Sequence, residues 1–88
     1  MSEWNGIPIM LDALAGEEKD GVYRFTTSVS RAEIELFYNR ELSQRGWELL
    51  GRKEGNVGAV LLIFSNADDT VSISILPDQN KFLVMIVK

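Results

Sequence analysis

The stretch over residues 29–49 (VSRAEIELFYNRELSQRGWEL), in the middle of the chain, carries the signals of a helix with a defined start and stop. Ser30 is a favoured N-cap, and Glu33 follows three residues later, the spacing of a capping box. Gly46 stands where the chain must turn left-handed to leave a helix. Between these signals, apolar residues recur at helical spacing. They are Ile34, Phe37, Tyr38 and Leu42. The segment therefore predicts an amphipathic helix with one face on a core.

Strand patterns separated by turn residues occupy the rest of the chain. Asp20-Gly21 marks a hairpin turn, with weak strand signals before it and clear alternation over residues 22–27. Four more strand patterns follow the helix, with turns at 53–56, 66–69 and 77–80. We therefore expect an α+β fold, a curved antiparallel sheet in the order β-β-α-β-β-β-β with one helix packed on one face. An 88-residue chain suits a single domain, here residues 1–88.

Residues 1–12 are apolar but irregular. Asn5-Gly6 is a turn signal, and Pro8 restricts the preceding residue to extended conformations. We expect an extended lead-in segment that packs its larger apolar side chains against the domain. These side chains are Trp4, Ile7, Ile9 and Leu11. The alternative is a frayed terminus.

Two late segments, residues 57–64 and 82–87, are apolar at successive positions, so both faces of each predicted strand are apolar. Residues 70–75 instead alternate, with Val71, Ile73 and Ile75 on the inward side. One helix is about 10 Å wide and neighbouring strands lie roughly 4.8 Å apart, so the helix shields two or three strands on one face. The second face of the two apolar strands therefore needs another cover.

Three covers for that second face remain open from the sequence. In the first, sheet curvature and the lead-in segment bury this face within one chain. In the second, another copy of the chain packs on it, and in the third, it lines a cavity for an apolar ligand. We predict a homodimer, with another protein as a second possible partner. The candidate interface residues are Leu62, Phe64, Leu83, Met85 and, on the helix face away from the stripe, Leu36.

Charge and residue usage narrow the possible chemistry. The chain has 9 Lys and Arg against 13 Asp and Glu, and this net charge of −4 disfavours nucleic acid and anionic membranes as partners. It has no cysteine and no histidine, so the commonest general base and the commonest transition-metal ligands are missing. The acidic runs at 16–21 and 67–69 lack the spacing of a calcium loop. We therefore predict no catalytic, cofactor-binding or metal-binding residues and no enzymatic activity.

The sequence carries no signal-peptide pattern, and no apolar run approaches the roughly 18 residues of a membrane span. We expect no membrane span in this chain. The compartment stays open: extracytoplasmic if the chain is the soluble part of an anchored protein, and cytoplasmic otherwise.

The strand before the helix carries a tyrosine, and the helix follows the pattern Ser-x-x-Glu-(Ile/Val)-x-x-Phe-Tyr-x-x-x-Leu-x-x-x-Gly-Trp. The matching residues are Tyr23, Ser30, Glu33, Ile34, Phe37, Tyr38, Leu42, Gly46 and Trp47. This pattern resembles a small bacterial α+β domain of unknown function that is often seen in envelope lipoproteins. The chain departs from the lipoprotein form because it has no signal sequence and no cysteine to carry a lipid. The resemblance implies a non-enzymatic module and assigns no catalytic residue.

These observations predict a non-catalytic protein-interaction or assembly module that self-associates through an apolar sheet face. The alternative is a binder of a small apolar ligand or lipid between the sheet and the helix.

Overall fold

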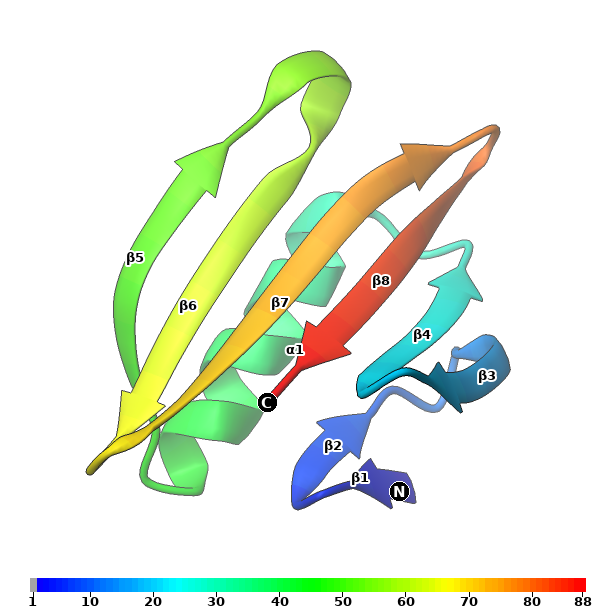
Figure 1. The fold of residues 1–88 in the computed structure, drawn as a ribbon. Helices are drawn as coiled ribbons and strands as arrows, with labels where there is room; N and C mark the ends of the chain where they lie inside the picture. Colours follow the sequence, from blue (N-terminus) through cyan, green and yellow to red (C-terminus); the bar gives the residue numbers. More distant parts are fainter. Residues whose placement is uncertain (1) are drawn as a thin grey trace.

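The computed structural model describes residues 2–88, and Figure 1 shows their fold. This part of the chain forms eight strands, one α-helix and a short 3₁₀ helix. Their bounds are β1 Ser2–Trp4, β2 Ile7–Ile9, β3 Leu14–Lys19, β4 Val22–Thr27, α1 Arg31–Gln44, β5 Glu48–Glu54, η1 Asn56–Gly58, β6 Val60–Asn66, β7 Asp69–Asp78 and β8 Lys81–Val87. The expected α+β class is confirmed.

Strands β3 to β8 form one antiparallel sheet in the order β3-β4-β8-β7-β6-β5. From β4 the chain crosses through α1 to the far edge, and the meander β5-β6-β7-β8 then returns to pair β8 with β4 (Figure 1). The expected meander is therefore confirmed. Both edge strands are irregular, because the register shifts between Leu14 and Glu17 in β3 and between Leu49 and Gly51 in β5.

Helix α1 begins and ends where its sequence signals predict. Ser30 Oγ accepts a hydrogen bond from the Glu33 N–H at 3.1 Å, which satisfies one free donor of the first turn. At the other end, Gly46 has φ +87° and its N–H donates to the Ser43 carbonyl at 3.2 Å. The Trp47 N–H donates to the Leu42 carbonyl at 2.9 Å. The two bonds form a Schellman motif, the αL ending that glycine favours.

The lead-in segment folds back on itself rather than running straight. Asn5 and Gly6 have φ values of 51° and 82°, and this turn pairs β1 with β2 in antiparallel register. Ile7 and Ile9 are buried as expected. The expectation that Leu11 packs against the domain is wrong. Its side chain is 83% exposed, and the adjacent Met10 is buried instead.

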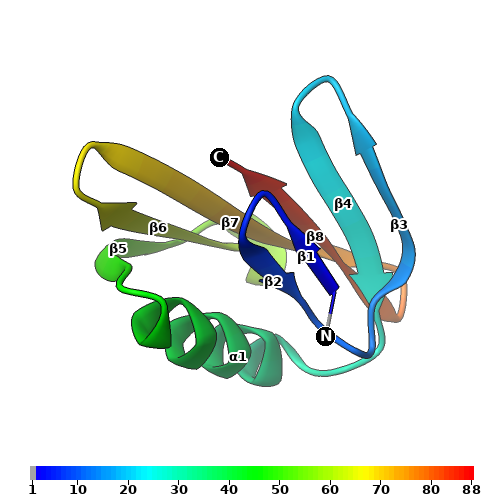
Figure 2. The same cartoon turned by 90° about the horizontal axis from the view of Figure 1, so that it is seen from below.

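Two separate elements, α1 and the β1–β2 hairpin, cover the same face of the sheet. Figure 2 shows the hairpin between α1 and β4. The hairpin is joined to the end of the helix, since Arg45 Nη1 lies 2.6 Å from Glu3 Oε2. Its turn accepts a hydrogen bond from Lys88 Nζ at the Asn5 carbonyl, at 2.8 Å. The lead-in thus shields part of the face that one helix is too narrow to shield.

A ring of four charges joins α1 to the edge strand β5. Arg52 donates to both carboxylate oxygens of Glu35, at 2.6 and 3.2 Å, and to Glu54 at 3.2 Å. Arg31 lies 3.5 Å from Glu35 and 3.4 Å from Glu54. The inward side of β5 therefore carries charged groups that are paired with the helix rather than with solvent alone.

We predict that Gly46→Ala lowers the free energy of unfolding by about 1 kcal/mol, because alanine is strained at positive φ. The cost comes from the backbone, since an added Cβ would make an ordinary contact with Asn66 Nδ2. Urea unfolding followed by circular dichroism measures the change. Gly51→Ala in β5 is the matched control, because its added Cβ would enter open space and its φ is not positive. An equal loss in both variants would contradict the assignment.

Candidate functional site

The sheet face turned away from α1 carries regular rows of side chains, and we call it the outer face. Directly paired residues of antiparallel strands point to the same side of a sheet. The first row runs Val22, Val87, Ser72, Ile63, and the second runs Arg24, Met85, Ser74, Leu61, Lys53. The third runs Thr26, Leu83, Leu76.

Seven of these outward side chains are large and apolar, and all are half-buried or exposed. They are Val22, Leu61, Ile63, Leu76, Leu83, Met85 and Val87. Ile63 and Val87 remain 37% and 43% exposed. The surplus of apolar residues in β6 and β8 therefore divides between two faces, one covered by α1 and the hairpin and one facing outward.

The structure separates the predicted interface residues into three places. Leu62 and Phe64 face the core, with exposures of 0% and 1%, which corrects the expectation that their side chains form a contact surface. Leu83 and Met85 lie on the outer face. Leu36 is 63% exposed on α1, which packs on the opposite side of the sheet.

The outward residues of β6 were not identified from the sequence because a continuous apolar run fits either facing. The neighbouring strand β7 carries the missing signal. Its alternation places Ile73 inward, and Ile73 pairs with Leu62. This pairing assigns Leu62 to the core and leaves Leu61 and Ile63 outward.

The middle row of the outer face also carries charge. Glu17 on the edge strand β3 pairs with Arg24, and Lys53 on the opposite edge strand β5 pairs with Leu61. Among residues 2–88, the buried Nε of Arg24 has no hydrogen-bond partner. The central strands of the outer face are thus mostly apolar, and its edge strands carry charged residues: Glu17 and Lys19 on β3 and Lys53 on β5.

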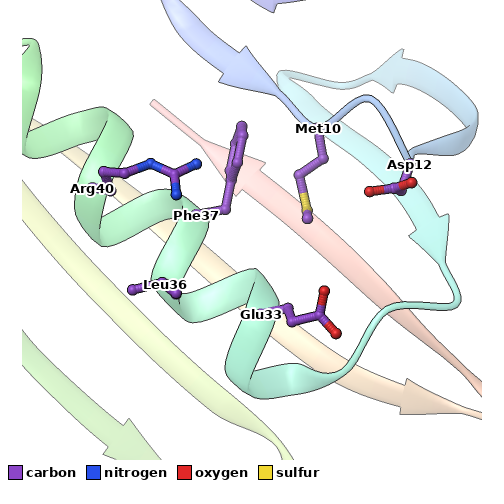
Figure 3. A pocket seen from close by; sticks show the side chains of 6 residues that line it. All are labelled: Met10, Asp12, Glu33, Leu36, Phe37 and Arg40. Carbon is purple, nitrogen blue, oxygen red and sulfur yellow. The ribbon is translucent and has the colours of Figure 1, made fainter.

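A pocket of about 220 Å³ lies where α1 meets the segment that follows β2 (Figure 3). Its lining residues are Met10, Asp12, Glu33, Leu36, Phe37 and Arg40. The Arg40 guanidinium lies 6.0 Å from the centre of the Phe37 ring, and Arg40 Nε also pairs with Glu41 at 3.3 Å. The pocket opens at the seam between the two elements that cover the inward face.

Tyr38 lies next to this seam, in the core. Its ring packs edge-on against Phe37, with ring centres 4.9 Å apart, and its side chain is fully buried. Within residues 2–88 its hydroxyl finds no hydrogen-bond partner. Burial raises the pKa of the Tyr38 hydroxyl far above its usual range, and the charge of Tyr23 adds to the rise. This phenol therefore stays neutral at ordinary pH and can donate one hydrogen bond.

We predict that Tyr38 makes the protein less stable in alkali. Because the folded pKa is raised, the unfolded chain loses its proton first, above its ordinary pKa of about 10. The contribution of Tyr38 is complete below that pH and falls by roughly 1.4 kcal/mol per pH unit above it. Urea unfolding at stepped alkaline pH measures the slope, and Tyr38→Phe should reduce it. Equal slopes in both proteins would contradict this account.

Within residues 2–88 no helix is long and apolar enough to cross a membrane. Across the same residues, no group of three or more His, Cys, Asp or Glu side chains is placed to hold a metal ion.

No curated protein and no solved structure matches the chain. The model of the START domain-like family matches residues 10–81, from the end of the lead-in to the start of β8. The resemblance to envelope lipoprotein domains stays a prediction. The chain belongs to the START domain-like family.

Proposed function

We propose that this chain is a non-catalytic interaction module that self-associates through its outer face. One observation carries the proposal: seven large apolar side chains, arranged in three adjacent rows, lie on the sheet face opposite both covering elements. Exposed apolar patches of this extent are uncommon on monomeric proteins unless they bind something.

The contrast between strands supports this use of the face. The outward positions of β7 include Ser72 and Ser74, the polar pattern of a strand facing water. The outward positions of its neighbours β6 and β8 are apolar, among them Leu61 and Met85. Solvation alone does not account for apolar residues on both sides of a serine stripe.

The size of the face sets the expected strength of association. Six strands spaced roughly 4.8 Å apart and about 20 Å long give a planar area on the order of 600 Å². Stable interfaces bury about 800 Å² per partner, so this face lies at the weak end of specific interfaces. A dimer with a dissociation constant in the micromolar range is the expectation.

The non-catalytic part of the proposal rests on the chemistry of the same face. Its central hydroxyls belong to Ser72 and Ser74. Their cross-strand neighbours are Ile63, Val87, Leu61 and Met85, apolar side chains that cannot take a proton from a serine.

We predict that Leu83→Glu converts a dimer into a monomer, because the new carboxylate would be buried between its uncharged cross-strand neighbours Thr26 and Leu76. Light scattering at high micromolar concentration measures the molar mass, and circular dichroism checks folding. Met85→Glu tests the same face at a second position and should have a smaller effect, because its cross-strand neighbour Arg24 can pair with the new carboxylate.

Leu36→Glu is the matched control, because it adds the same charge at an exposed leucine on α1, across the molecule from the outer face. We expect this variant to remain dimeric. A parent chain that stays monomeric at high micromolar concentration would refute self-association.

A second candidate function, binding of a small apolar ligand or lipid between sheet and helix, has its own support. The family description START domain-like is compatible with ligand binding. The buried Tyr38 hydroxyl also lacks a partner among residues 2–88, a costly state that a ligand oxygen would relieve. The pocket between Met10 and Phe37 would be the entrance, since the two covering elements meet there. The side chains that now fill the core would have to move apart.

If the chain binds an apolar ligand, we predict that native mass spectrometry of the chain purified without detergent shows the mass of the chain plus a bound molecule. Extraction with an organic solvent should remove this added mass. Tyr38→Phe should lower the fraction of chains that carry it, because the hydroxyl is the proposed contact. Tyr23→Phe is the control, because it removes the hydroxyl of a half-buried tyrosine instead of the one enclosed in the core. The bare chain mass in every preparation would exclude a retained ligand.

A further inference from the structure

We infer that two copies of this chain pack about a two-fold axis parallel to their strands, so that Lys53 of each copy pairs with Glu17 of the other. This inference rests on the proposed self-association and adds its geometry. Most homodimers have two-fold symmetry, and a face-to-face pair of sheets must place the axis in the plane between them. For aligned sheets, whose strands stay within about 30° of each other, the axis then runs close to the strand direction or across it, and we place it over the middle row.

The charges of the middle row distinguish these two arrangements. The row runs from Glu17 on β3, through Arg24 on β4, to Lys53 on β5. An axis across the strands would lay each strand over its own copy. It would bring Glu17 toward Glu17, Arg24 toward Arg24 and Lys53 toward Lys53. Like charges at these positions disfavour that dimer.

An axis along the strands exchanges the two edges of the sheet instead. The β3 edge of one copy then lies over the β5 edge of the other, and Glu17 meets Lys53 at both ends of the row. Arg24 lies over the uncharged Leu61, its counterpart at that place in the row. Lys19, in the neighbouring row, faces the Gly51 side of β5. Each of these three pairs is therefore either opposite in charge or has one uncharged member.

The shape of the sheet agrees with this arrangement. In Figure 2 the β3–β4 hairpin stands away from α1, whereas β5 lies close beside α1. The β3 edge thus projects toward a partner on the outer face, and the β5 edge recedes from it. An axis along the strands sets each projecting edge against a receding one, whereas an axis across them sets projecting edges against each other.

Charge reversal tests whether Glu17 of one copy pairs with Lys53 of the other. Glu17→Lys alone places two lysines at each end of the row, and Lys53→Glu alone places two glutamates there. Each single variant should dimerise about tenfold more weakly than the parent, because two rim attractions become repulsions. An equimolar mixture of the two variants restores opposite charges at both ends. It should therefore form a heterodimer with nearly the parent dissociation constant, as measured by sedimentation velocity.

Asp68→Lys is the matched control, since it lies in the exposed β6–β7 turn and raises the net charge by the same two units as Glu17→Lys. We expect it not to weaken the dimer. If the parent dimerises and both single variants dimerise equally well, the axis is wrong while self-association stands. Weakened single variants without rescue on mixing would also overturn the axis. A monomeric parent would overturn the proposed function itself.

Discussion

Pairing of the alternating strand β7 with its two apolar neighbours determines the rest of the structure. Ile73 and Ile75 point inward, and the register then sets the facing of Leu62 in β6 and of Ile86 and Val84 in β8. A shift of one residue in either pairing would exchange the buried and outward halves of that strand. Because β6 and β8 are apolar on both sides, their own sequences resist such a shift weakly, and the polar serines of β7 supply the discrimination.

The inward face is covered by two elements, the helix that forms the crossover from β4 to β5 and the hairpin at the N-terminal end of the chain. Helix α1 packs with Ile34, Tyr38 and Leu42, and the β1–β2 hairpin adds Ile7 and Ile9. Their seam is held by Arg45 with Glu3 and borders the pocket between Met10 and Phe37. The Tyr38 hydroxyl, which has no hydrogen-bond partner among residues 2–88, lies in the core next to this seam.

Features encoded by a few adjacent residues were predictable from the sequence. Ser30 and Gly46 bound the helix, and Asp20-Gly21 forms the β3–β4 turn with positive φ at both residues, because each signal acts within one turn of backbone. The facing of Leu62 depends on a partner strand, so its own segment left it undetermined. The exposure of Leu11 follows from the hairpin that precedes it, a contact between elements that local patterns do not encode.

The two irregular edge strands have a consequence for how the molecule avoids uncontrolled growth. Ala15 adopts φ +55° at the register shift in β3, and the shift in β5 falls beside Leu50. Arg52, which points to the helix side of β5, is also tied to Glu35. Bulged, charged edges are poor templates for adding another strand. The two edges of this sheet therefore disfavour open-ended, fibril-like stacking of one chain onto the next.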